Sequence, residues 1–319
     1  MLRTRLTDRL GIRHPILLAP MDKVAGGALA AAVSSAGGLG LIGGGYGDAE
    51  WLEAQFEAAG NQPVGAGFIT WALARQPSLL DLCLERNPRA MAFAFGDATA
   101  FVEQCRAAGV MTIWQVHRLD QARRAIAAGT DIIVAQGQEA GGHGMERGLA
   151  TLLPALRDLA GEEQILVGAG GLGDGRGLAA CLMLGADGIM MGTRLWASAE
   201  AVGPDSAKAR LVAASGDDTV RTKVFDLARD LDWPWHFTGR VLHNDFSRRW
   251  HGDIDGLKAQ IEQERARYDE AAAEDYATRV VIGGEVVDLI TSVKPAADIV
   301  AETVATAARL IRDAPGRYL

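Results

Sequence analysis

The sequence is short of two features that would place it in a special class of protein. It has only three cysteines in 319 residues, Cys83, Cys105 and Cys181. None belongs to a Cys-x-x-Cys pair, and each falls in a segment with a helical pattern, so we interpret them as reduced packing residues. We expect no metal site. Glycine or charged residues also interrupt every apolar run before it is long enough to span a membrane.

Basic tracts and an amino-terminal leader pattern are missing too. The net charge is −8, from 32 Lys and Arg against 40 Asp and Glu, and no cluster of basic residues suggests a nucleic-acid surface. Residues 1–20 carry charges throughout and lack the apolar core of a signal peptide. We therefore expect a cytoplasmic protein of ordinary globular composition, with no nucleic-acid or membrane partner.

What the first two-thirds of the chain does contain is an alternation of short apolar runs and amphipathic segments. The runs scarcely alternate with polar residues, which is typical of strands buried on both faces of a parallel sheet. We predict strands at Ile16–Ala19, Gly38–Ile42, Val64–Ile69, Ala90–Phe95, Val110–Val116, Asp131–Ala135, Ile165–Gly168 and Gly188–Met191. Several of the amphipathic segments between them end at a glycine, as helices commonly do.

A count near eight strand–helix units, closing around residue 200, predicts an α/β protein with a TIM (β/α)8 barrel. A doubly wound open sheet is the runner-up, although it usually has fewer strands before its topology reverses. The pattern changes after Trp196, because residues 205–277 are charged and helical in character. We predict a barrel formed by residues 1–204 and 278–319, with a small helical domain inserted at residues 205–277.

The most informative segment for function is Gln136–His143, which directly follows a predicted buried strand. Loops at strand ends carry chemistry because a rigid scaffold positions them. The three glycines of the segment, including Gly142, let the backbone approach a flat ligand, and a histidine exchanges a proton near neutral pH. A glycine-rich turn with a structural histidine is the alternative. His143 is the stronger candidate for a catalytic residue, and His117, after the fifth strand, is a weaker one.

Two further segments predict a phosphate site. Val167–Gly171 closes the seventh strand and Met190–Arg194 closes the eighth. TIM barrels often bind phosphate between these two loops. Gly170 and Gly171 would bring their N–H groups close to the oxygens, while the free N–H groups of the following helix favour an anion. The alternative is that these glycines only permit tight turns.

Polar and polarizable residues occur at other strand ends. Met21, after Pro20, could lie against a flat ring. Gln115 and Gln136 are polar residues in apolar strands, where each needs a partner. Either side chain could bind a flavin ring, or could instead bind a neighbouring backbone group.

Taken together, these motifs resemble the nitronate monooxygenases, formerly called 2-nitropropane dioxygenases. The resemblance runs from about Leu6 to Leu310 and also rests on Asp174–Gly177, Gly185–Arg194 and Lys294–Val300. It implies a TIM barrel with a small inserted helical domain and FMN at the carboxyl-terminal mouth. His143 would be the base or the substrate-orienting group. The candidate cofactor-binding residues are Pro20, Met21, Gln115, Gln136, Gly142, Ala169, Gly170, Gly171, Met191, Gly192 and Thr193.

The activity implied by the resemblance is the FMN-dependent oxidation of alkyl nitronates by molecular oxygen. The expected partners are a small nitronate or nitroalkane and oxygen, and a homodimer is the assembly that we allow for. The sequence departs from the family at Gln115, where several relatives carry Lys, and at Phe68, where many carry an Asn that contacts FMN. Thr70 could replace that contact. The family also has a Gly-Gln or Gly-Glu pair near the cofactor, matched here by Gly284 and Glu285.

Two alternatives stay open. The same barrel could serve an NAD(P)H-dependent flavin reductase of a quinone or enoyl substrate. A phosphosugar lyase or isomerase without flavin would share the phosphate loops, but it normally needs a Lys or carboxylate base at a strand end, and no such Lys is evident.

Overall fold

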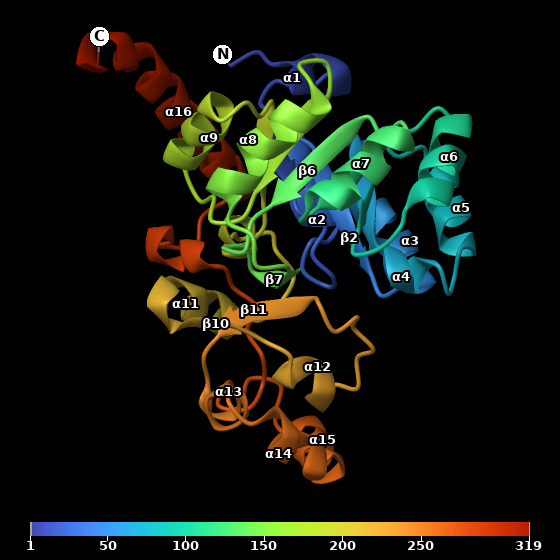
Figure 1. The fold of residues 1–319 in the computed structure, drawn as a ribbon, viewed down its shortest axis with the longest axis vertical. Coiled ribbons are helices and arrows are strands. Elements are labelled where there is room, and N and C mark those ends of the chain that lie inside the picture. The colour runs from blue at the N-terminus through green and yellow to red at the C-terminus, as the bar shows by residue number, and fades with distance from the viewer. Residues whose placement is uncertain (1, 319) are drawn as a thin grey trace.

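A computed structural model describes residues 2–318 and contains a barrel of eight parallel strands (Figure 1). The strands are β1 (Ile16–Leu18), β2 (Gly40–Gly45), β3 (Val64–Ile69), β4 (Ala90–Ala94), β5 (Met111–Val116), β6 (Ile132–Gln136), β8 (Ile165–Ala169) and β9 (Gly188–Met191). They run in the order β1-β9-β8-β6-β5-β4-β3-β2. A parallel bridge between Leu17 and Leu39 brings β1 back to the β2 side, so the sheet nearly closes. The predicted TIM barrel is confirmed.

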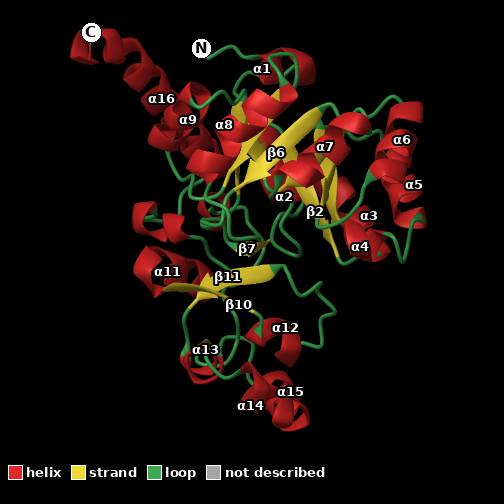
Figure 2. Ribbon diagram, viewed as in Figure 1, coloured by secondary structure: helices red, strands yellow, loops and turns green. Residues whose placement is uncertain are grey.

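Helices alternate with these strands and cover the outside of the barrel (Figure 2). They are α2 (Gly27–Ser35), α3 (Ala49–Ala59), α4 (Thr70–Leu73), α5 (Ser78–Glu85), α6 (Thr99–Ala107), α7 (Leu119–Ala127), α8 (Leu149–Ala160), α9 (Gly175–Met183), α10 (Thr193–Trp196) and α16 (Ala296–Tyr318), whereas α1 (Arg5–Leu10) lies at the amino ends of the strands. Glycines with positive φ follow α6 and α7 at Gly109 and Gly129, as the sequence predicted. Each cysteine is buried within one of these helices.

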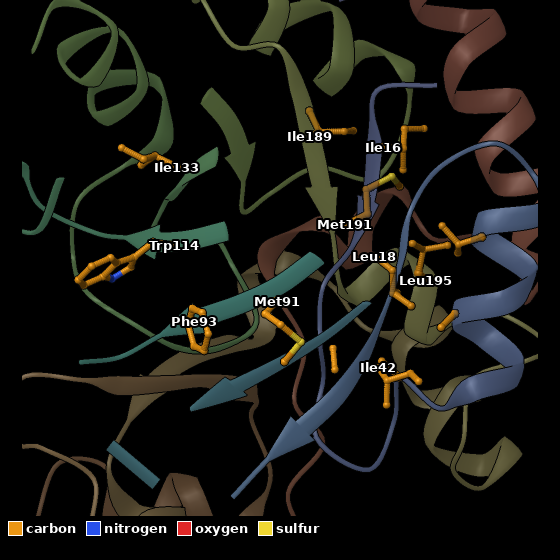
Figure 3. Packing of buried hydrophobic residues seen from close by; sticks show 14 of the residues in the cluster. Ile16, Leu18, Ile42, Met91, Phe93, Trp114, Ile133, Ile189, Met191 and Leu195 are labelled. Atoms are coloured by element: carbon orange, nitrogen blue, oxygen red, sulfur yellow. The ribbon is translucent and has the colours of Figure 1, made fainter. Parts of the chain in front are cut away.

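The strands are apolar on both faces because each face packs into a different core. Side chains such as Leu17, Ile113 and Val134 fill the barrel interior, which Leu6 and Leu10 of α1 close at the amino ends of the strands. The alternate residues point outward and pack against the helices, and Figure 3 shows this outer layer. This double burial explains why continuous apolar runs located the strands correctly.

The segment after the eighth strand contains both helices and strands. Its elements are α11 (Asp205–Ala213), η1 (Gly216–Asp218), β10 (Thr219–Thr222), α12 (Val224–Ala228), β11 (Thr238–Leu242), α13 (Asp245–Trp250), α14 (Ile254–Ala259) and α15 (Ile261–Glu270). The predicted insert is thus mainly helical, and it also contains the strands β10 and β11. The strands β10 and β11 are short and contain several polar residues, so they lack the apolar run that marks the barrel strands. The domain boundaries themselves stay a prediction.

This inserted segment joins the barrel at the end opposite α1 (Figure 1). The connection is an antiparallel sheet, in which β11 pairs with β10 on one side and with β7 (Gly142–Gly144) on the other. His143 itself pairs with Gly239. The glycine-rich segment after β6 is thus a strand that holds the insert, and not only a loop. The chain then returns through η2 (Glu285–Leu289) to α16.

The end of the barrel that α1 closes carries a buried ionic network. Asp187, before β9, accepts hydrogen bonds from Arg5 and Arg157 and from the backbone N–H of Leu166. The side chains of Asp187 and Arg157 are only 6% and 10% exposed. Because both charges are desolvated, each depends on the other, and this end of the barrel serves stability.

Asp187→Ala should therefore destabilise the fold by about 3–5 kcal/mol, since it leaves a buried arginine without its carboxylate. The matched control is Asp232→Asn, which removes an ion pair with Arg75 in which Asp232 is 81% exposed. That variant should change stability by less than about 1 kcal/mol. Urea denaturation of both variants measures the difference, and equal losses would contradict a buried network.

Candidate active site at the barrel mouth

The carboxyl ends of the barrel strands and the inserted segment enclose a cavity of about 360 Å³. This volume lies in the range of small-molecule sites in proteins. Its wall is mostly apolar, with a few polar groups from several strand ends. The mouth of a TIM barrel is where enzymes of this fold place their active sites, so the cavity is the candidate site.

Nearly all of the residues proposed from the sequence meet in this cavity. Those that line it are Pro20, Met21, Gln115, Gln136, Gly142, His143, Ala169, Gly170, Gly171, Gly192 and Thr193. Met191, the remaining candidate, does not line the cavity. It points outward into the core between strands and helices (Figure 3), whereas Met190 lines the cavity because successive residues of a strand face opposite sides.

The loop after β8 presents backbone with almost no side chains. Gly170 and Gly171 have φ values of 102° and 70°, which glycine adopts without strain. A Cβ at Gly171 would lie 3.1 Å from the Cβ of Glu139. Within residues 2–318, the backbone N–H groups of Gly171, Leu172 and Thr193 donate to no protein acceptor. These donors at the cavity wall are suited to an anion.

The segment that returns from the insert to the barrel contacts Thr193, next to these unpaired N–H groups. The backbone N–H of Gly284 donates to Thr193 Oγ1 over 3.1 Å, which leaves the hydroxyl proton free to donate. Glu285 does not face the cavity, because its carboxylate pairs with Arg240 at 2.8 Å. The Gly-Glu pair thus lies next to the predicted phosphate corner, with only the glycine in contact with it.

His143 is held by residues of the inserted segment. Its Nε2 atom lies 2.8 Å from Asp226 Oδ1, and its ring stacks on Trp233 at 3.4 Å with an interplanar angle of 4°. Lys223 Nζ lies 3.3 Å from the other carboxylate oxygen. In residues 2–318 Nδ1 has no hydrogen-bond partner, so a neutral ring donates its Nε2 proton to Asp226 and keeps Nδ1 as a free base.

The electrostatics of the site keep His143 neutral. Burial lowers the pKa of His143, and the hydrogen bond and charge of Asp226 partly oppose that effect. Lys223 and Arg221 lower the pKa further. A histidine with a pKa below its ordinary value of about 6.5 is unprotonated at neutral pH and can accept a proton.

His117, the weaker candidate, does not line the cavity. It is fully buried, and its Nε2 atom lies 2.5 Å from Gln136 Oε1. Burial lowers its pKa to about 4, so it stays neutral at physiological pH. A neutral ring that donates from Nε2 occupies the Gln136 carbonyl and leaves the amide NH2 as the group available to a ligand.

Of the residues considered at the ends of β5 and β3, some line the cavity and one does not. Gln115 lines the cavity and its amide makes no hydrogen bond among the described residues. Phe68 also lines the cavity and adds an apolar surface there. Thr70 is buried, its hydroxyl has no partner among residues 2–318, and it does not line the cavity, so it does not supply the missing Asn contact.

Aromatic residues that the sequence did not single out form one wall. Trp233 donates to the Tyr46 hydroxyl over 2.8 Å, and Phe95 packs edge-on against Trp233. Burial raises the pKa of Tyr46 to about 12. Phe95 has a φ of 67°, an unusual backbone conformation for a bulky residue and one that is found at functional sites. No local pattern could have indicated this wall, because its members lie on distant segments.

A TIM barrel that holds a histidine–carboxylate pair at a cavity by the carboxyl ends of its strands has the architecture of an enzyme. The family model for nitronate monooxygenase matches residues 3–69 and 69–306. The chain therefore belongs to the nitronate monooxygenase family and is an oxidoreductase.

Individual relatives agree with this assignment. A nitronate monooxygenase from Neurospora crassa is 30% identical, over 91% of this chain and 88% of that protein. A 5-hydroxy-7a-methyl-1-oxo-octahydro-1H-indene-4-carboxyl-CoA dehydrogenase from Rhodococcus jostii is 33% identical, over 81% of this chain and 71% of that protein. Among solved structures, FabK from Thermotoga maritima superposes with a TM-score of 0.87 at 30% identity, covering 99% of this chain and 100% of that one.

Asp226→Asn should lower the pKa of His143 still further. The substitution removes the negative charge and the carboxylate acceptor that favour the protonated ring, and it leaves Lys223 uncompensated. Histidine NMR titration measures this, with the His143 signal assigned by its absence in His143→Gln. A pKa that stays the same or rises would contradict the Asp226 contact.

Proposed function

We propose that the chain is an FMN-dependent nitronate monooxygenase, which oxidises alkyl nitronates or their parent nitroalkanes with molecular oxygen. The observation that carries the proposal is that His143 lines the cavity of a barrel of this family, with Nε2 held by Asp226 and Nδ1 without a hydrogen-bond partner among residues 2–318. The name of the Neurospora crassa relative supports the choice of substrate.

The residues present are suited to FMN. The unpaired N–H groups of Gly171, Leu172 and Thr193 would hold its phosphate. The amides of Gln115 and Gln136 would face the polar edge of its ring. When bound, FMN supplies the redox chemistry, taking electrons from the substrate and returning them to oxygen.

The protein's own part in the reaction would be to bind the substrate, orient it and remove its proton. His143 Nδ1 would remove the proton from the carbon that bears a nitro group, and would orient a substrate that is already ionised. Asp226 keeps the tautomer and stabilises the ring when it takes up the proton. Trp233 and Phe95 exclude water on one side of the site.

A second candidate is an NAD(P)H-dependent reductase of a quinone or enoyl substrate. The observations that favour it are the dehydrogenase-named relative from Rhodococcus jostii and the mostly apolar cavity wall. A flavin-free phosphosugar enzyme is not proposed, because the chain belongs to the nitronate monooxygenase family.

Three expectations stay predictions. Oxygen as the electron acceptor follows only from the proposed activity, and the homodimer and the cytoplasmic location follow only from the sequence. Among residues 2–318, no helix combines the length and apolar character needed to cross a bilayer.

Gly171→Asp should abolish retention of the cofactor. It places a negative side chain on one of the residues whose N–H groups would bind the phosphate, and like charges repel strongly in a partly water-shielded site. Wild-type protein should be yellow and release FMN on heating, whereas the folded variant should be colourless. The measurement is flavin released per folded chain.

Gly161→Asp is the matched control, because Gly161 has a φ of 71° and a Cβ added there would meet no other atom within 4 Å. It likewise places an aspartate at a position with positive φ, but away from the cavity, and should keep its flavin. A Gly171→Asp protein that folds and retains full FMN would show that the phosphate binds elsewhere.

His143→Ala should fold and keep FMN but lose activity on neutral nitroalkanes by a factor on the order of 10²–10⁴, the usual effect of removing a general base. Activity on the pre-ionised nitronate of the same compound should fall far less, since no proton has to be removed. Steady-state kinetics on both forms decide the role. Equal losses would favour orientation over proton transfer, and no loss on either form would remove His143 from the reaction.

A further inference from the structure

The cavity contains one cation that the fold leaves without a partner. Three of its lining side chains carry a formal charge, Asp22, Lys23 and Arg229. Lys23 is bound to Asp48 at 2.5 Å and lies 4.6 Å from the ring of Trp51. The guanidinium of Arg229, in contrast, makes no hydrogen bond or ion pair with any of residues 2–318. Arg229 is nevertheless half-buried in a largely apolar wall.

The position of Arg229 relates it to the candidate base. It directly follows α12, and its backbone N–H donates to Phe225 O at 3.1 Å, so it continues the last helical turn. Asp226, which holds His143, lies three residues earlier. Residues three apart on a helix share a side. One short helix and the residue after it thus carry both the partner of His143 and an unpaired cation that lines the cavity.

The charge of Arg229 acts across this cavity. Burial raises the pKa of Asp22, and the positive charges of Lys23 and Arg229 oppose that effect. Arg229 likewise favours the ionised form of Tyr46 against burial. Neither group lies close enough to Arg229 to form an ion pair. The guanidinium of Arg229 is half-buried and has no anionic partner among residues 2–318. It is therefore placed to bind an anionic ligand.

We propose that Arg229 binds the anionic group of the substrate and makes this site select anionic over neutral molecules. A guanidinium offers two parallel N–H groups, which match a planar anion with two oxygens, such as a carboxylate or a nitronate. That the natural anion is a nitronate rests on the proposed function. The recognition of a planar anion with two oxygens does not depend on the proposed function.

The test compares benzoate with benzamide, a charged and a neutral planar molecule of nearly the same shape. Calorimetric titration of the purified flavin-containing protein should show tighter binding of benzoate. Arg229→Gln should reduce benzoate affinity by roughly 10- to 100-fold, since a hydrogen bond to a charged group contributes about 1.5–3 kcal/mol, and should change benzamide affinity little. Arg248→Gln removes an exposed arginine of the same inserted segment and should change neither.

Arg229→Lys keeps the charge but loses the paired donors, so it should give an intermediate benzoate affinity. If Arg229→Gln does not fold, this variant carries the test, and wild-type affinity in it would overturn the proposal. Equal binding of benzoate and benzamide by the wild type would also overturn it, as would unchanged selectivity in Arg229→Gln.

Kinetics separate this proposal from the proposed function. If wild-type protein oxidises nitronates, Arg229→Gln should raise the KM for a nitronate by the same 10- to 100-fold with a smaller effect on kcat. If it does not oxidise them but benzoate selectivity still depends on Arg229, the proposed function fails and the anion site stands. Nitronate oxidation with an unchanged KM in Arg229→Gln would leave the function and overturn the anion site.

Discussion

The hydrogen bond between His143 and Asp226 is the contact on which the candidate site depends. It joins a residue of the barrel to one that lies 83 positions further along the chain, in the inserted segment. The pairing of β7 with β11 fixes the backbone on one side of this bond, and the stacking of Trp233 fixes the ring on the other. Because Asp226 occupies Nε2, it decides which nitrogen remains free to act as a base. The insert therefore completes the site and is not an appendage to a finished barrel.

The two ends of the barrel are built on different physical principles. At the amino ends of the strands, buried charges are fully paired, as in the network of Asp187 with Arg5 and Arg157. At the carboxyl ends, backbone N–H groups, the Gln115 amide and the Arg229 guanidinium are left without partners among residues 2–318. Unsatisfied polar groups in a largely apolar cavity cost stability, and a ligand that pairs with them recovers it. The proposed flavin and an anionic substrate are such ligands.

The barrel could be predicted from the sequence because its signal is local and repeated. Runs such as Val64–Ile69 are buried on both faces, so they are apolar throughout. Gly171 and His143 could be found because glycine-rich strand ends are unusual within such runs. Asp226 and Arg229 could not, since a carboxylate and an arginine in a charged helical segment look like solvated residues. The strands of the insert could not be predicted either. Arg240 and its neighbours pair with the adjoining strands through their backbone, and no apolar run marks them in the sequence.

Anaerobic reduction of the purified protein tests whether this site takes electrons from a nitro compound, as the proposed function requires. The yellow protein is mixed without oxygen with propionate 3-nitronate, and separately with NADH and with NADPH, while the absorbance of the oxidised flavin is followed. We expect rapid loss of that absorbance with the nitronate and little change with either nicotinamide. Rapid loss with NADH or NADPH, and none with the nitronate, would contradict this expectation and establish the reductase alternative.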